Sequence, residues 1–361
     1  MNPLGEILAR RIRATGPLTV AEYMAEALGH PVHGYYSTRD PFGVAGDFIT
    51  APEISQVFGE LIGLWCADCW DRMGRPDPVL LVELGPGRGI LMADALRAAK
   101  ALPGFRAAIR PHLVETSPKL RKLQADRLAD GEAQWHDEIG DVPHGPMLLI
   151  ANEFLDALPI RQYQRGPEGW HERRIGLDEQ GALAFRLEAK PSLPAGLREG
   201  PAGSLWEICP AAAGIATAIG ARLKRNKGVA LFIDYGYFPS GLGDTLQAVR
   251  RHRPQGVLDS PGEADLTAHV DFAAAAAAGI KAGADAYGPV SQGDFLSALG
   301  LAQRAAKLLQ RASPEQAKDI ESACRRLIAS DEMGTLFKVL ALTHPGFPAP
   351  VGFADQESFL P

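Results

Sequence analysis

Short apolar runs alternate with stretches of helical periodicity along most of this chain. Runs of mainly apolar residues bounded by turn residues are typical of strands buried in a parallel sheet, and the intervening stretches carry apolar residues three and four positions apart. This alternation favours an α/β fold with a Rossmann-like, doubly wound sheet. We predict core strands near the following positions: Leu80, Leu113, Trp135, Leu148, Phe232, Tyr287 and residues 336–342.

The same pattern predicts elements outside this sheet. Apolar spacing over residues 4–12 and 20–28 indicates two helices in a helical N-terminal region. Residues 160–205 open with alternating apolar and polar positions and contain a Gln-Gly turn, so they favour an inserted antiparallel unit. Residues 291–330 favour added helices, and the alanine run at 273–278 is also predicted to be helical.

One stretch carries more chemistry than any other. Residues 79–91 predict a buried strand that ends in a carboxylate, Glu83, followed by a glycine turn and the start of a helix. The turn contains three glycines: Gly85, Gly87 and Gly89. Glycines let the backbone approach a ligand, and free N–H groups at the helix start attract negative groups. A dinucleotide site would have G-x-G-x-x-G, but this chain has Ile90 at the last position.

This spacing resembles motif I of methyltransferases that use S-adenosylmethionine (SAM). The methionine part of SAM carries a carboxylate and an ammonium, which need a donor-rich turn beside an acid such as Glu83. Two further acids end the next predicted strands: Glu115, placed to accept both ribose hydroxyls, and Asp137, near the expected adenine position. Residues 102–104 are predicted to be a loop that lengthens the first unit. Acids that cap helices and glycines that ease packing would give the same pattern without a ligand.

The segment at residues 147–159 predicts a fourth strand and then a polar turn with Asn152, Glu153 and Asp156. Ligands of open α/β sheets bind beyond the carboxyl ends of the strands, so these side chains should lie near the transferred methyl group. An arginine substrate stays protonated, and two carboxylates could orient its planar fork and hold its charge. Equally, Glu153 and Asp156 could simply offset a helix dipole. Asp234, at the tip of the fifth strand, is a second candidate.

Composition narrows the choice of partner. The chain has 361 residues and a net charge of −6, which gives no long-range attraction to nucleic acid or anionic lipid. No apolar run approaches the roughly 18 residues that would insert into a membrane. We therefore expect a small molecule or a protein as substrate. Cys66 and Cys69 lie in a pattern that favours a plain helix face over a metal site, so no metal is expected.

Six strings spread over nearly the whole chain resemble the MidA-like family of SAM-dependent methyltransferases. They are residues 33–36 (HGYY), 46–56 (GDFITAPEISQ), 83–89 (ELGPGRG), 152–159 (NEFLDALP), 234–236 (DYG) and 262–271 (GEADLTAHVD). The family includes a mitochondrial assembly factor of respiratory complex I that methylates arginine. The resemblance therefore implies SAM as cofactor and a protein substrate, either a complex I subunit or another arginine-containing protein. A small-molecule methyltransferase and a non-catalytic SAM-binding assembly factor remain alternatives.

Two of these strings suggest further site residues. Asp47 and Thr50 flank an aromatic residue in the long irregular segment 29–52, where residues 43–52 could form a lid over SAM. His269 could take a proton at neutral pH, although residues 265–267 would also make a good helix entrance.

We therefore predict two parts of the chain. Residues 1–75 form a helical N-terminal region with a cofactor-covering loop, and residues 76–361 form the methyltransferase core. The start of the chain has no apolar signal region, and its Glu6 argues against a transit peptide. The location expected is the cytoplasm for a bacterial protein and the mitochondrial matrix for a eukaryotic one.

Overall fold

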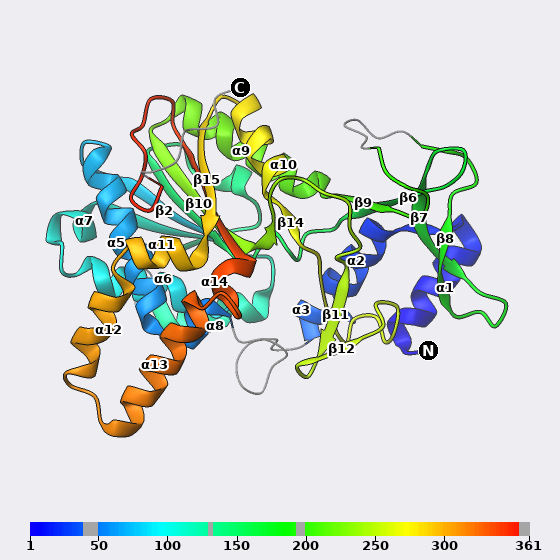
Figure 1. Ribbon diagram of the computed structural model, residues 1–361, viewed down its shortest axis with the longest axis horizontal. Helices are drawn as coiled ribbons and strands as arrows, with labels where there is room; N and C mark the ends of the chain where they lie inside the picture. The colour runs from blue at the N-terminus through cyan, green and yellow to red at the C-terminus, as the bar shows by residue number, and fades with distance from the viewer. Residues whose placement is uncertain (39–49, 129–132, 193–198, 354–361) are drawn as a thin grey trace. The chain divides into compact units, whose positions relative to one another are not determined.

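The computed structural model describes residues 1–38, 50–128, 133–192 and 199–353 (Figure 1). The chain divides into two compact units, each assembled from three separate segments. Unit 1 contains Met1–Phe48, Asp156–Ala212 and Phe238–Asp271. Unit 2 contains Ile49–Leu155, Ala213–Tyr237 and Phe272–Pro361.

The central sheet of unit 2 confirms the α/β fold class. Its strands are, in spatial order, β15 (Asp285–Ser291), β16 (Phe337–Thr343), β10 (Gly228–Tyr237), β5 (Met147–Asn152), β2 (Val79–Leu84), β3 (Ile109–Val114) and β4 (Gln134–His136). From β10 to β4 the neighbours are parallel, whereas β16 runs antiparallel to both β10 and β15. Strand order reverses between β2 and β5, which is where open α/β sheets bind their ligands.

Helices cover this sheet because its central strands are apolar on both faces. Every residue of β2 and β5 is buried, as expected for parallel strands between helical layers. The helices are α4 (Ala51–Ile54), α5 (Gln56–Arg72), α6 (Ile90–Ala99), α7 (Pro103–Ala108), α8 (Pro118–Leu128), α9 (Pro210–Arg225), α10 (Phe272–Lys281), α11 (Gln292–Ala298), α12 (Leu301–Leu309), α13 (Pro314–Ile328) and α14 (Met333–Leu336), with a short 3-10 turn at Ile139–Asp141. The predicted added helices are confirmed as α11 to α13, and Figure 1 shows α12 and α13 extending from the sheet as a helical pair.

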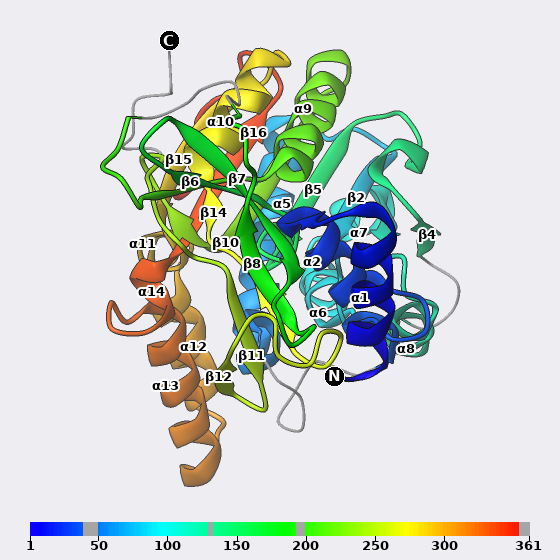
Figure 2. The ribbon, with the colours of Figure 1, turned by 90° about the vertical axis from the view of Figure 1, so that its right-hand side faces the viewer.

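Unit 1 packs helices against antiparallel strands. Its helices are α1 (Pro3–Thr15), α2 (Val20–Gly29) and α3 (Tyr35–Thr38). Its strands are β1 (Leu18–Thr19), β6 (Arg161–Arg165), β7 (Trp170–Leu177), β8 (Leu183–Leu187), β9 (Leu205–Ile208), β11 (Gln247–Arg250), β12 (Arg253–Gln255), β13 (Asp265–Thr267) and β14 (Val270–Asp271). Strands β6 to β9 confirm the predicted antiparallel insertion, and Figure 2 shows β7 and β8 running side by side.

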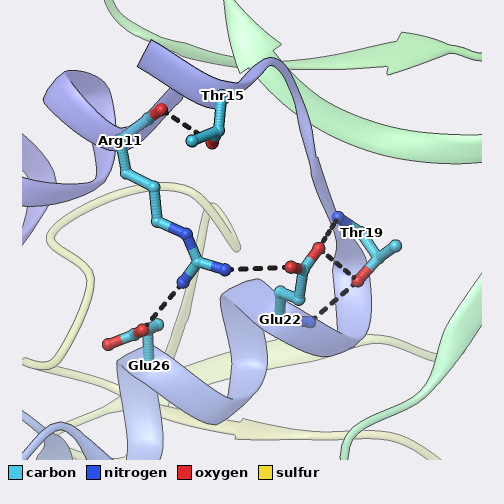
Figure 3. A network of polar contacts seen from close by, with 5 residues as sticks. All are labelled: Arg11, Thr15, Thr19, Glu22 and Glu26. Carbon is cyan, nitrogen blue, oxygen red and sulfur yellow. Dashed lines mark hydrogen bonds and ion pairs between the residues drawn. The ribbon is translucent and has the colours of Figure 1, made fainter. Parts of the chain in front are cut away.

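The first two helices of unit 1 are held together by a polar network (Figure 3). Thr19 caps α2 through the N–H of Glu22, whose carboxylate in turn accepts from the Thr19 N–H. Arg11 of α1 reaches both Glu22 and Glu26 at 2.9 Å. The bonds from Thr19, followed by the charge of Arg11, lower the pKa of Glu22 despite some desolvation. The cap fixes the start of α2 at Val20, where the apolar spacing also placed it.

Three local predictions were wrong. Of the loop predicted at residues 102–104, residues 103 and 104 instead begin α7, because Pro103 is suited to the first turn of a helix. Residues 265–267 form strand β13, paired with β11, and the helix entrance lies further on at α10. Within the segment expected to be irregular, α3 and the start of α4 are helical, whereas residues 39–49 lie outside the described part of the chain.

Candidate active site

The glycine turn joins β2 to α6 and uses backbone conformations that favour glycine. Gly85, Gly87 and Gly89 have φ values of 59°, 51° and 74°. A Cβ on Gly85 would lie 2.6 Å from Cδ2 of Phe154, and one on Gly89 would lie 3.3 Å from Cγ of Gln124. The N-cap residue of α6 is Gly89, which has no side chain to cap the helix. The N–H groups of Gly85 and Gly89 donate to the carbonyl oxygens of Val114 at 3.0 Å and Pro86 at 2.7 Å. The turn therefore suits a ligand through its glycine conformations and the nearby helix start, and not through these two donors.

Glu83, next to the last residue of β2, has a buried carboxylate. Its side chain accepts the N–H of Met92 in α6, but burial raises its pKa to about 8. Across the described residues, Glu83 Oε2 and Asn152 Oδ1 are buried oxygens without a hydrogen-bond partner. They lie on the neighbouring parallel strands β2 and β5. Buried acceptors are nearly always satisfied, so this pair fits the ammonium group of a SAM methionine.

Glu115 follows β3 and is also buried. Its Oε1 accepts the N–H of Ser117 at 2.7 Å, and its Oε2 accepts from Gln124 Nε2 at 3.3 Å. Burial raises the pKa of Glu115, while the bonds from Ser117 and Gln124 counter that rise. This carboxylate holds the turn into α8 and has the chemistry to accept ribose hydroxyls. Asp137, after β4, has a side chain 79% exposed and pairs with Arg121 at 2.6 Å.

Gln124 is a buried polar residue that the sequence reasoning missed. Its side chain is fully buried on α8 and bonds to Gly87, Glu115 and Trp135. The available signal was positional: the buried residues of α8 are Leu120, Gln124 and Leu128, four apart. A glutamine in the middle of an apolar stripe indicates a buried partner for its amide.

The turn after β5 holds Glu153 in a strained conformation. Its φ of 48° lies in the left-handed region, which non-glycine residues adopt rarely and at a cost of about 1–3 kcal/mol. Glu153 Oε1 accepts the N–H of Ala51 at 2.8 Å and Nδ2 of Asn152 at 3.2 Å. Thr50 precedes α4 in a capping box with Glu53. Strain of this kind is concentrated at functional sites.

Asp234 of β10 anchors the same turn. Its Oδ2 accepts the N–H groups of Phe154 at 3.1 Å and Leu155 at 2.9 Å, and its Oδ1 accepts its neighbour's N–H, that of Tyr235, at 2.9 Å. With an exposed fraction of 1%, the carboxylate is enclosed by backbone donors. This geometry supports a positioning role, by which Asp234 fixes the residues that follow Glu153.

Asp156 and His269 belong to unit 1. The carbonyl oxygen of Asp156 accepts the N–H of Ala268 at 2.9 Å. Tyr36 Oη donates to Asp265 Oδ1 at 3.2 Å. Burial, followed by the charges of Asp265 and Asp156, raises the pKa of Tyr36 well above its usual range.

The backbone N–H of His269 donates to Thr245 Oγ1 at 2.9 Å, and burial lowers the pKa of its imidazole, which favours the neutral ring. Asp47 lies outside the described residues. Unit 2 thus collects the glycine turn, the acid of β2 and the acids that follow β3 and β5 at the carboxyl ends of neighbouring strands.

Two further predictions concern cysteines and membranes. Cys66 and Cys69 are buried on α5, and burial raises the pKa of the Cys66 thiol to about 12, which suits an inert helix face. Within the described residues, no helix combines the length and apolar character needed to cross a membrane.

The fold and the glycine turn define a methyltransferase of the SAM-dependent class, and comparison with known proteins identifies the family. A sequence profile of S-adenosyl-L-methionine-dependent methyltransferases matches residues 61–290. The chain belongs to this family, and it is a SAM-dependent enzyme. This confirms the resemblance noted from the sequence strings.

Similar proteins align along almost the full chain. Protein arginine methyltransferase NDUFAF7, mitochondrial, from Danio rerio is 38% identical over 93% of this chain and 85% of its own length. The protein of the same name from Homo sapiens is 36% identical over 95% of this chain and 83% of its own length. A crystal structure from Burkholderia thailandensis, bound to S-adenosyl-homocysteine, has a TM-score of 0.84 at 30% identity and covers 99% of this chain and 98% of that one.

Proposed function

We propose that this enzyme methylates arginine side chains of a protein substrate, with Glu153 binding the guanidinium. The observation that carries the proposal is the strained position of Glu153 at the carboxyl end of β5, on the strand beside the glycine turn. A carboxylate held there against its backbone preference is suited to a cationic substrate. The arginine methyltransferases named above, which align over more than nine-tenths of this chain, support the same substrate class.

We assign separate roles to the residues of unit 2. Bound SAM supplies a methyl group already activated for transfer. The glycines of the turn (Gly85, Gly87 and Gly89), the acids Glu83 and Glu115 and the amide of Asn152 would hold the cofactor, with Asp137 near its adenine. Glu153 would hold the guanidinium fork and its charge, so that one nitrogen faces the methyl group and the proton it loses leaves to solvent. Asp234 would keep the turn in place through the N–H groups of Phe154 and Leu155.

The residues of unit 1 supply further candidates. Asp156 is buried, and its charge, after that of Asp265, raises the pKa of Tyr36. It stays a candidate for binding the guanidinium. His269 is a candidate proton carrier, and its lowered pKa suits a neutral acceptor. Thr50 and Asp47 are candidates for contacts with SAM, and residues 43–52 for a lid over it. A complex I subunit is the first substrate to test, in the cytoplasm of a bacterium or the mitochondrial matrix of a eukaryote.

A labelling experiment tests this function. Purified protein and SAM carrying an isotopically labelled methyl group are added to a proteome from cells lacking the gene, and labelled peptides are mapped by mass spectrometry. We expect label on arginine, lowered by roughly a hundredfold with Glu153→Gln and retained with Glu321→Gln, an exposed control on α13. Label found on a small molecule or on another residue type, or no label with a protein that binds SAM, would overturn the proposal.

A further inference from the structure

Gln124 is the buried junction of three segments that surround the candidate cofactor site. Its Nε2 donates to the carbonyl oxygen of Gly87 at 2.7 Å and to Oε2 of Glu115 at 3.3 Å. Its Oε1 accepts from Nε1 of Trp135 at 2.8 Å. Gly87 belongs to the glycine turn, Glu115 follows β3, and Trp135 lies on β4, so one side chain touches all three.

Hydrogen-bond chemistry fixes the orientation of this amide. An amide nitrogen has two donors, and both meet acceptors here, while the amide oxygen meets the only donor, the indole N–H. The flipped amide would face its oxygen toward two acceptors and its nitrogen toward a donor, so every bond would be lost. Glutamine is the side chain of this length that combines two donor hydrogens with an acceptor oxygen. Glutamate would direct an oxygen at Glu115 and Gly87, and leucine would satisfy none of the three.

We infer that Gln124 is a positioning residue for ribose recognition, which aims the Glu115 carboxylate at the ribose hydroxyls and ties it to the glycine turn. The inference rests on the assignment of Glu115 to the ribose of SAM. Glu115 Oε1 is held by the backbone of Ser117, so Gln124 is the side chain that fixes the second oxygen. A Cβ at position 89 would lie 3.3 Å from Gln124 Cγ, so glycine at this position leaves room for the Gln124 side chain to reach the turn.

The test compares two ligands, S-adenosyl-homocysteine and its 2′,3′-dideoxy analogue, by calorimetry. If Glu115 binds the hydroxyls, the wild-type protein prefers the first ligand by about tenfold or more, the scale of charged hydrogen bonds. Gln124→Leu should lower this preference to about threefold or less, because Glu115 is no longer aimed. Gln134→Leu, an exposed glutamine on β4 next to Trp135, is the matched control and should keep the preference.

Each outcome separates a positioning role from a structural one. A folded Gln124→Leu protein that loses affinity equally for both ligands, or that keeps the wild-type preference, overturns the inference. If melting curves show that Gln124→Leu does not fold, Gln124→Asn replaces it, because it keeps the amide but is one carbon too short to reach all three partners. Its preference for S-adenosyl-homocysteine over the dideoxy analogue then tests the inference in the same way. A wild-type protein without any preference would refute the ribose role of Glu115, and with it this inference, without bearing on arginine as the substrate.

Discussion

Glu83→Gln is expected to change how the stability of the ligand-free protein depends on pH. Burial raises the pKa of Glu83 to about 8, against an ordinary value of 4.5. Below pH 4.5 the carboxyl is protonated in both the folded and the unfolded chain. Between these two pKa values the unfolded chain loses the proton while the folded protein keeps it, so the free energy of unfolding falls as pH rises.

The size of this effect follows from the same pKa values. At about 1.4 kcal/mol per pKa unit, the loss reaches roughly 3 kcal/mol at pH 7 and approaches about 5 kcal/mol above pH 8. Glutamine has nearly the same shape, keeps an oxygen for the Met92 N–H, and carries no proton to lose. The effect of the glutamine itself on the free energy of unfolding does not depend on pH. The difference in unfolding free energy between the two proteins therefore changes with pH by the amount that Glu83 contributes.

Scanning calorimetry of the ligand-free proteins from pH 5 to pH 9 measures this difference. The wild-type melting temperature should fall relative to Glu83→Gln as pH rises, whereas Glu321→Gln should follow the wild-type protein throughout. Parallel wild-type and Glu83→Gln curves would refute the reasoning. Addition of SAM should reduce the wild-type pH dependence, because an ammonium beside Glu83 favours the ionised carboxylate.

Three further outcomes are expected. Gly85→Ala should destabilise unit 2 by about 2 kcal/mol or more, because its Cβ would meet Phe154 at a left-handed φ; denaturant unfolding with a loss below about 0.5 kcal/mol would contradict this. Glu153→Gln should lower methyl transfer by roughly a hundredfold while SAM affinity changes only a few-fold; calorimetry and a transfer assay separate the two, and full activity would exclude Glu153. Asp234→Asn should cost about 1–3 kcal/mol, because the amide cannot accept every backbone N–H, and hydrogen exchange should then speed up at residues 153–155; unchanged exchange would contradict the anchoring role.

The sequence was informative wherever local chemistry determines local structure. Strand β2 and its glycine turn could be predicted because an apolar run, an acid and glycines at fixed spacing leave few other conformations. The parallel core and the added helices followed from periodicity in the same way. The turn at Glu153 was placed correctly after its strand.

The roles of residues that depend on partners far along the chain could not be predicted from local sequence. The role of Gln124 depends on Gly87, Trp135 and Glu115, which lie 37, 11 and 9 positions away along the chain. The alternative of a helix entrance at residues 265–267 was wrong because the pairing partner of β13, strand β11, lies in a separate stretch of sequence. The left-handed backbone of Glu153 likewise arises from tertiary contacts, and a glutamate carries no local preference for it.

The discontinuous composition of unit 1 has a consequence for synthesis on the ribosome. Helices α1 and α2 emerge first, yet Tyr36 bonds to Asp265, and a Cβ at Gly262 would overlap the carbonyl oxygen of His33, so these partners are separated by more than 200 residues. The core around the first helices therefore cannot close until nearly three-quarters of the chain has been synthesised. Such long loop closures are slow, and they leave apolar faces such as that of α2 exposed to chaperones or aggregation in the meantime. A chain whose translation stalls after β10 and before β11 should have unit 1 still open, although all the parallel strands of unit 2 have been synthesised.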